Sequence, residues 1–460
     1  MNRTRPANLP MPSTLRSFLT ARGSDARLAE QPPPQPLPDA NDLPRVVVDA
    51  TRAFQSIEGF GAAFTEAAAV TWQKLGAPQR DALQRDYFDP HHGHGYTLCR
   101  VHMNSCDFSL GNYAHVEAPG DTELESFSIE RDRQALLPFI KAAQSVAVQP
   151  IKLLASPWSP PGWMKTDGQM NHGGKLRPEH RAAWARCYVR FIEEYAKEGV
   201  PIWGVSVQNE PAAKQTWDSC LYSAEEERDF VRDHLGPALH AAGLGHVKIV
   251  VWDHNRDQMV ERASVIYGDP EAARYVWGTG FHWYGESHFD HVQLVHDAWP
   301  DKQLLFTEGC QEGGPHRGSW DLGERYAHSM INDLNRWTVG WIDWNLLLDE
   351  HGGPNHVGNY CSAPILADTA HGALQHQSSY HYIGHFARFV KPGARRVLCA
   401  ASRLDLEPTA FVNPDGTIAT VVLNRTDAAI PFALCCGAQT VAAELPPRSI
   451  ATYLADGPGN

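Results

Sequence analysis

One pattern recurs eight times along the middle of the chain and constrains the fold more than any other feature. A short apolar run ends in polar or aromatic residues, a loop follows, and an amphipathic helix comes next. Eight strand–helix alternations over roughly 330 residues predict an α/β protein built as a (β/α)8 TIM barrel. The eight runs are Ile57–Phe64, Thr97–Asn104, Ile151–Trp158, Ile202–Glu210, Val247–Asp253, Gly278–Tyr284, Gln303–Glu308 and Gly340–Leu348.

The segments between these runs carry helix start and stop signals. Pro178 stands where a first helical residue belongs, and Gly199 stops the apolar repeat that follows it. Ser223-Ala-Glu-Glu226 has the pattern of a capping box. Ser128 can cap another helix, in which Pro138 predicts a kink or a restart. These signals support the assignment of each run to a strand that is followed by a helix.

The two ends of the chain follow another pattern. After Ala394 short strands alternate with turns, and Pro414-Asp-Gly416 is a hairpin signal. Before the barrel, Ser13–Leu28 and Val46–Asp49 each predict a strand, and the Pro-rich joint between them cannot be helical. These N-terminal strands have no place in the barrel, so we expect them to complete a small β-sandwich. The predicted organisation is residues 1–56 for the N-terminal strands of the sandwich, 57–393 for the barrel and 394–460 for the rest of the sandwich.

Charge and composition exclude several classes of function. The chain has 40 basic and 53 acidic residues and a formal net charge of −13, which disfavours nucleic acid or an anionic membrane as a partner. No run reaches the length of about 18 apolar residues that a membrane span needs. Nine cysteines in 460 residues argue against a secreted disulfide scaffold. The first twenty residues contain no apolar signal region, so we expect a cytoplasmic location.

The C-terminal ends of the predicted barrel strands are where an active site is expected. Glu210 follows the fourth apolar run directly, and Glu308 follows the seventh. A carboxylate at the end of a buried strand is costly unless it is partnered or used. Two carboxylates facing one pocket are what hydrolysis of a glycosidic bond requires, one as nucleophile and one as acid. Their placement suits the separation of about 5–5.5 Å that goes with retention of configuration.

Seven motifs, in this order along nearly the whole chain, resemble glycoside hydrolase family 30, the glucosylceramidase-like family of retaining glycosidases. None of the seven is decisive alone, whereas their common order is a specific signal. They are IEGFGAAFTEA at Ile57–Ala67, CRVHMNSCDFS at Cys99–Ser109, SPWSPPGWMKT at Ser156–Thr166, SVQNEP at Ser206–Pro211, HWY at His282–Tyr284, FTEGC at Phe306–Cys310 and DWNLLLDEHGGPNHVGN at Asp343–Asn359.

The resemblance implies a role for each matching residue. Glu308 would be the nucleophile, Glu210 the acid/base and Asn209 the donor to the sugar 2-hydroxyl. Glu210 should then have a raised pKa, because the ionised Glu308 lies nearby. The remaining implied residues are Asp107, Trp163 and Trp344 on the sugar, His282 and Tyr284 beside the nucleophile, Arg100 beneath the nucleophile to keep it ionised, and Cys310 and Asn359 near the pocket. Trp158, which ends the third run, fits a core position and a supporting role at the site equally well. This chain has His102 where the glucosylceramidase pattern has Pro.

Several alternatives stay open. The expected substrate is a β-linked glucoside or oligosaccharide, hydrolysed by a β-glucosidase or glucosylceramidase-like activity, with a β-1,6-glucanase or a β-xylosidase as alternatives. A catalytically inactive carbohydrate-binding barrel would need one of the two glutamates replaced or the pocket filled, and both glutamates are present. A metal-dependent hydrolase would need a His-x-His motif on the first strand, where Gly59-Phe-Gly61 stands. His91-His-Gly-His94 lacks carboxylate or Cys partners, so we expect no metal site and no cofactor.

Overall fold

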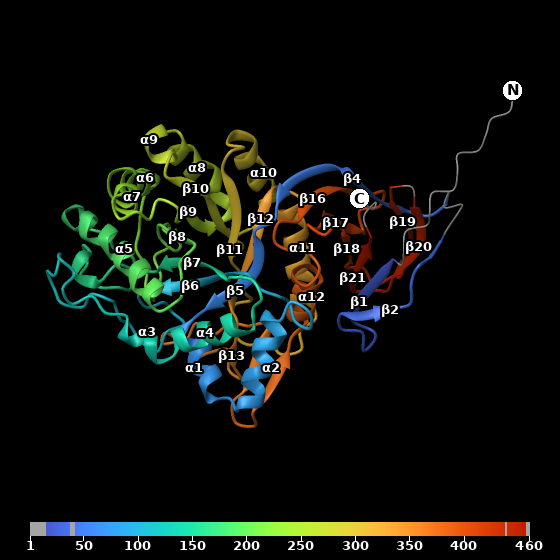
Figure 1. Ribbon diagram of the computed structural model, residues 1–460, viewed down its shortest axis with the longest axis horizontal. Helices are drawn as coiled ribbons and strands as arrows, with labels where there is room; N and C mark the ends of the chain where they lie inside the picture. Colours follow the sequence, from blue (N-terminus) through green and yellow to red (C-terminus); the bar gives the residue numbers. More distant parts are fainter. Residues whose placement is uncertain (1–14, 37–41, 438, 457–460) are drawn as a thin grey trace. The chain divides into compact units, whose positions relative to one another are not determined.

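A computed structural model describes residues 15–36, 42–437 and 439–456 of the chain (Figure 1). It divides into two compact units, Ile57–Arg388 and a second unit made of the described residues of Met1–Ser56 and Phe389–Asn460. Among the helices in the described ranges, none combines the length and the apolar character needed to cross a membrane. The predicted lack of a signal region falls largely on residues 1–14, outside the described residues.

The unit Ile57–Arg388 is a closed barrel of parallel strands in the order β10-β11-β12-β5-β6-β7-β8-β9 (Figure 1). Each strand overlaps one of the eight predicted runs, which confirms the (β/α)8 barrel. β8 is shorter than its predicted run, so Glu210 follows the strand in a loop. The strands are β5 Gly59–Phe64, β6 Leu98–Met103, β7 Lys152–Pro157, β8 Gly204–Ser206, β9 Lys248–Asn255, β10 Val276–His282, β11 Gln303–Glu308 and β12 Thr338–Asn345.

Several predicted signals stand where helices of this unit begin or end, whereas the N-cap of α3 is Ile129 rather than the predicted Ser128. Ser223 accepts from the Glu226 N–H, which forms the predicted capping box of α6. Pro178 opens a 3-10 turn before α5, and the segment around Pro138 restarts as α4 directly after α3. The helices are α1 Glu66–Lys74, α2 Ala77–Phe88, α3 Glu130–Gln134, α4 Leu136–Val146, α5 Arg181–Lys197, α6 Ala224–Phe230, α7 Gly236–Ala241, α8 Met259–Tyr267, α9 Pro270–Ala273, α10 Phe289–Ala298, α11 Asp321–Leu334 and α12 Ser378–Ala387. Shorter elements are the turns η1 Gly162–Met164, η2 Pro178–His180, η3 Val231–Leu235 and η4 Arg256–Gln258, and a small sheet of β13 Leu348–Asp349, β14 Ile365–Asp368 and β15 Ala373–His376.

The barrel interior is a packed apolar layer below the strand ends. Buried side chains from five strands form it, namely Leu98, Leu154, Val250, Leu305 and Ile342. The first strand approaches its neighbour so closely that a Cβ on Gly61 would overlap the backbone carbonyl of Leu98. Gly61, which stands where a metal-dependent hydrolase would have a histidine, therefore has a packing role, because only glycine permits this close approach of the two strands.

The second unit is a ten-stranded sheet built from both chain ends, in the order β2-β1-β21-β18-β17-β16-β4-β19-β20-β3. β1 pairs with β21, and β4 lies between β16 and β19, which confirms the predicted β domain of shared origin. The strands are β1 Arg16–Ala21, β2 Ala29–Gln31, β3 Gln35–Pro36, β4 Arg45–Ser56, β16 Arg395–Ala401, β17 Glu407–Val412, β18 Ile418–Asn424, β19 Ile430–Cys436, β20 Gln439–Leu445 and β21 Ser449–Ala455.

The short strands β2 and β3 of this unit were not predicted. Phe389 belongs to this compact unit: its ring packs on Phe18 with centroids 4.5 Å apart, and its backbone carbonyl accepts from Asn413 Nδ2. β20 is absent from the sequence prediction, since most of its residues are half-buried and show no clear alternation.

Candidate active site

A cavity of about 110 Å³ lies at the C-terminal ends of the barrel strands, where the sequence predicts the site. Both predicted glutamates line it, together with most of the other predicted residues. The lining consists of Asp107, Trp158, Asn209, Glu210, Gln215, Trp217, His254, Asn255, Tyr284, Glu308, Cys310, Glu312, Trp344, Asn359 and Cys361.

The two glutamates face each other across this cavity. Glu308 is the last residue of β11, and Glu210 lies in the loop after β8. A carboxylate oxygen of Glu210 and one of Glu308 lie within 4.8 Å of each other. Glu210 has a left-handed backbone with φ of 48°, and its N–H donates to the Asp253 carbonyl at 3.0 Å. A non-glycine residue held in this conformation is typical of a functional site that the surrounding structure constrains.

Arg100, from β6, lies fully buried beneath Glu308, the position that the family resemblance implies. Its Nη1 donates to Glu308 Oε2 at 2.5 Å. Its Nη2 donates to Asp253 Oδ2 at 2.7 Å and to Asn209 Oδ1 at 2.9 Å. Because the Asn209 oxygen is engaged by Arg100, the amide Nδ2 is the group that Asn209 can offer to a ligand in the cavity.

Tyr284 holds the other oxygen of Glu308. The Tyr284 hydroxyl donates to Glu308 Oε1 at 2.9 Å, and the Tyr284 backbone N–H donates to Asn255 Oδ1 at 2.8 Å. The same hydroxyl lies 3.5 Å from Cys310 Sγ. Each oxygen of the Glu308 carboxylate is therefore oriented by a donor from a different strand end, which restricts its rotation.

His282 is buried between two carboxylates rather than in the cavity lining. Its Nδ1 lies 3.3 Å from Glu210 Oε1 and its Nε2 lies 3.0 Å from Asp253 Oδ1. Burial lowers the pKa of His282, but Glu308, Asp253 and Glu210 outweigh it and raise the value to about 9. An imidazole with a carboxylate oxygen at each nitrogen is favoured as the doubly protonated cation.

The acid–base balance of the site corrects the prediction for Glu210. Burial raises the pKa of Glu210, but the imidazoles of His254 and His282 outweigh it and lower the value to about 2. The pKa of Glu308 is raised by burial, which His282 and Arg100 offset only in part. The sequence prediction considered the two glutamates and Arg100 without the histidines. With His282 present, the proton expected on Glu210 rests on His282, one hydrogen bond away.

The remaining walls combine a carboxyl group with aromatic rings. Asp107 Oδ2 accepts from Asn359 Nδ2 at 3.1 Å, and burial and Glu308 raise the pKa of Asp107 to about 8. Trp158 and Trp344 stack with centroids 5.1 Å apart, and the Arg100 guanidinium lies 4.7 Å from the Trp158 ring. The cavity thus offers hydrogen-bonding groups beside apolar ring surface, a combination suited to a sugar.

Three predicted residues, Trp163, His282 and Arg100, do not line the cavity, and several lining residues were missed. Trp163 lies outside the lining, because its indole N–H donates to the Val116 carbonyl at 3.1 Å and its ring packs against His180. The missed lining residues are Gln215, Trp217, His254, Asn255, Glu312 and Cys361. His254 and Asn255 are the last two residues of the fifth barrel strand, so a search of the C-terminal strand ends would have identified them. The other four lie in loops and have no sequence signal.

Comparisons with known proteins agree with this geometry. The family model for the glycosyl hydrolase family 30 TIM-barrel domain matches residues 57–390, and the model for the family 30 beta sandwich domain matches residues 393–453. Lysosomal acid glucosylceramidase of Mus musculus is 38% identical over 402 residues, which cover 83% of this chain and 78% of that protein.

Two solved structures superpose over nearly the full length. SrfJ from Salmonella typhimurium has a TM-score of 0.92 at 39% identity and covers 96% of this chain and 99% of that one. The endo-beta1,6-glucanase BT3312 has a TM-score of 0.87 at 28% identity and covers 97% of this chain and 100% of that one. With both family models matched in succession, the chain belongs to glycosyl hydrolase family 30 and is a glycoside hydrolase.

Proposed function

We propose that this glycoside hydrolase removes one terminal β-linked glucosyl residue from its substrate, with retention of configuration. The observation that carries the proposal is the size of the cavity. The cavity of about 110 Å³ is several times larger than the roughly 10–15 Å³ that a single water needs on this scale. That space suits one pyranose ring, whereas an internal unit of a glucan chain needs room on both sides of the cleaved bond.

Glu308 acts as the nucleophile in the first step. Its carboxylate oxygen forms a bond to the anomeric carbon while the bond from that carbon to the leaving oxygen breaks, and Glu210 protonates the leaving oxygen. The carboxylate oxygens within 4.8 Å of each other support retention, since inversion needs about 6.5–9.5 Å between the two groups. Arg100 and Tyr284 hold Glu308 in its orientation for the attack.

The proton for the leaving group comes from the Glu210–His282 pair. When the substrate displaces water, the charged form of Glu210 becomes more costly and its pKa rises. The proton on His282 Nδ1 then moves along the 3.3 Å contact to Glu210 Oε1, and Asp253 stays hydrogen-bonded at Nε2. His282 therefore acts as a positioning and proton-storing residue, while Glu210 makes the transfer to the substrate.

The second step releases the sugar. Glu210, now a carboxylate, takes a proton from a water whose oxygen bonds to the anomeric carbon as the bond to Glu308 breaks. Asn209 Nδ2 donates to the sugar 2-hydroxyl, a contact that strengthens as the ring flattens towards the transition state. Both inversions take place at the same carbon, so the product keeps the β configuration.

A glucoside is the substrate that the comparisons favour. The relatives near 38% identity include a protein named a glucosylceramidase, and the named endo-beta1,6-glucanase is 28% identical. His102, the position that departs from the glucosylceramidase pattern, lies outside the cavity lining, with its Nε2 accepting from the Glu66 N–H at 3.1 Å. That departure therefore makes no contact with a sugar in this cavity.

The experiment combines covalent labelling with a substrate panel. An activated 2-fluoro β-glucoside should label one residue of the wild type, and peptide mapping should locate the label on Glu308. Glu308→Gln should take no label, whereas Glu312→Gln, a matched change of another cavity-lining glutamate, should be labelled normally. Free glucose should be the single early sugar product from aryl β-glucosides and glucosylceramide. Oligosaccharides released early from a β-1,6-glucan would contradict the proposal and favour an endo-glucanase.

A further inference from the structure

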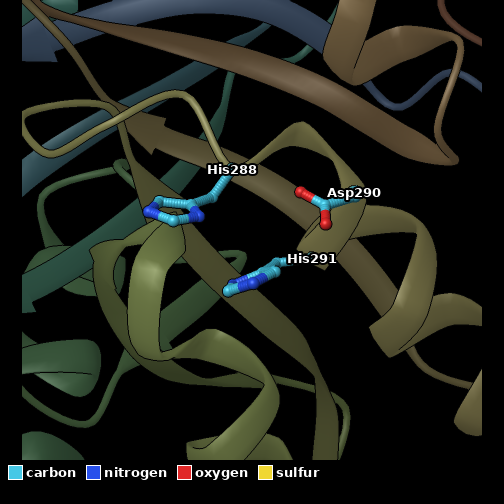
Figure 2. A group of neighbouring side chains, drawn as sticks. All are labelled: His288, Asp290 and His291. Carbon is cyan, nitrogen blue, oxygen red and sulfur yellow. The ribbon is translucent and has the colours of Figure 1, made fainter.

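A second group of chemically active side chains lies where the loop after β10 enters α10. His288, Asp290 and His291 each contribute one atom of a metal-ligating type, and these atoms lie within 4.8 Å of one another (Figure 2). The two imidazole rings lie side by side, with centroids 4.7 Å apart and an interplanar angle of 30°. None of the three lines the catalytic cavity.

A hydrogen bond selects the free nitrogen of His291. His291 Nδ1 lies 3.0 Å from the Arg256 backbone carbonyl. A carbonyl oxygen only accepts, so Nδ1 carries the proton and Nε2 keeps its lone pair. A donor bond from the second ring nitrogen to a carbonyl is the usual support of a metal-ligating histidine, because it fixes both the tautomer and the ring orientation.

Among the described residues, the side chains of Asp290 and His288 make no other contact that would prevent them from binding a metal ion. Within the part of the chain that the structure describes, the exposed Asp290 carboxylate makes no hydrogen bond or ion pair. His288 has a left-handed backbone with φ of 35° and gives α10 no side-chain cap. Glu286 Oε2 lies 3.8 Å from His288 Nε2 and adds negative charge. The His288 ring packs against the His291 ring and does not cap the helix.

We propose that His288, Asp290 and His291 bind one divalent transition-metal ion of the Zn²⁺ class. Two imidazole nitrogens and one carboxylate oxygen form a donor set that Zn²⁺ accepts, with water in the fourth position. Metal–ligand bonds of about 2.0–2.2 Å place tetrahedral ligands about 3.3–3.6 Å apart. Rotation of the exposed Asp290 and the half-buried His288 side chains closes the remaining gap.

The catalytic cluster is a poorer site for the same ion. Glu210, His282 and Glu308 also bring ligand atoms within 4.8 Å of one another. There, Arg100 and Tyr284 occupy the Glu308 oxygens, and both His282 nitrogens face carboxylates. An ion would have to displace the buried Arg100 cation, so we expect it at the α10 site, where it joins the loop after β10 to the first turn of the helix.

The test measures metal binding with untagged full-length protein. Isothermal titration with Zn²⁺ should give about one ion per chain, and bound Co²⁺ should give a visible spectrum without the charge-transfer band of thiolate ligands. His288→Ala, Asp290→Asn and His291→Ala should each weaken Zn²⁺ binding at least about tenfold. Zn²⁺ should raise the Tm of the wild type by mass action, and this rise should disappear in the three variants.

A matched variant controls for surface histidines in general. His371 is exposed and pairs with Asp368 at an i,i+3 spacing, with Nδ1 and Oδ2 2.9 Å apart, but among the described residues this pair is not part of a three-ligand group. His371→Ala should bind Zn²⁺ as the wild type does. Asp290→Asn changes an exposed side chain to one of equal size, so its loss of binding is not an effect of unfolding. Absence of stoichiometric Zn²⁺ uptake, or equal uptake by the variants, would overturn the proposal.

Discussion

Replacement of His282 by Asn tests the proton balance of the catalytic site. The Asn amide keeps an N–H donor near the position of His282 Nδ1, which faces Glu210 Oε1 at 3.3 Å, but it has no titratable proton. In the wild type the pair loses its proton only near the His282 pKa of about 9. In the variant the proton must be held by Glu210 alone. We therefore expect the alkaline limb of the kcat/KM profile to move to lower pH.

The size of this shift follows from the two pKa values. The ordinary glutamate value is 4.5, and a buried catalytic glutamate reaches about 6–7. With a value of about 6, the protonated fraction of Glu210 at pH 8 is about 1%, because it falls tenfold for each pH unit above the pKa. The wild-type pair, with its value of about 9, keeps about nine tenths of its proton at pH 8. The predicted loss is about 100-fold at pH 8 and at most a few-fold at pH 5.

The assay is kcat/KM on an aryl β-glucoside with a poor leaving group, measured from pH 4 to about 10. His254→Asn is the matched control: His254 Nε2 lies 3.8 Å from the same Glu210 oxygen, but burial lowers the pKa of His254 below its ordinary value of 6.5, so it has lost its proton before the alkaline limb. Its alkaline limb should stay in place. An equal loss for His282→Asn at pH 5 and pH 8 would mean that His282 only positions Glu210 and would refute the proton-storage hypothesis.

Three further predictions concern the site and the fold. Asn209→Ala should lower kcat by about 10²–10³-fold, roughly 2.7–4 kcal/mol, with a much smaller loss on a 2-deoxy glucoside; equal losses would contradict a bond to the 2-hydroxyl. Gly61→Ala should give insoluble protein because its Cβ overlaps the Leu98 carbonyl, whereas Gly111→Ala, with open space around it, should stay soluble. Deletion from Ala394 onward removes the partners of β1 and β4 and leaves open strand edges, so solubility should be lost; a soluble, fully active barrel would contradict this.

Local patterns in the sequence were sufficient for the barrel and for its two glutamates. Each apolar run has the length and the bounding signals of a strand, and each following segment repeats at helical spacing, so these choices depend on neighbouring residues. The positions of Glu210 and Glu308 then follow, since parallel strands bring their C-terminal ends to one face. β20 was missed for the same reason: its half-buried residues give no local alternation.

Contacts between distant residues needed the tertiary structure. Arg100 and Glu308 are 208 positions apart, and Glu210 and His282 are 72 apart; no local pattern links them. The matching motif placed Trp163 on the sugar, yet its indole N–H binds a carbonyl outside the cavity. His288, Asp290 and His291 are close in the sequence, but their spacing alone does not predict a metal site. The contact of His291 Nδ1 with the Arg256 carbonyl, which leaves Nε2 free, is visible only in the structure.

The sequence by itself determined which residues stand at the strand ends, because strand and helix formation respond to nearest neighbours along the chain. The protonation of the catalytic groups was decided only in three dimensions. The low dielectric of the buried site strengthens every charge–charge interaction, so His282, wedged between Glu210 and Asp253, takes the proton that the two glutamates alone would have placed on Glu210. That outcome depends on distances of about 3 Å between side chains from three different strand ends, which barrel closure creates and a linear sequence does not contain.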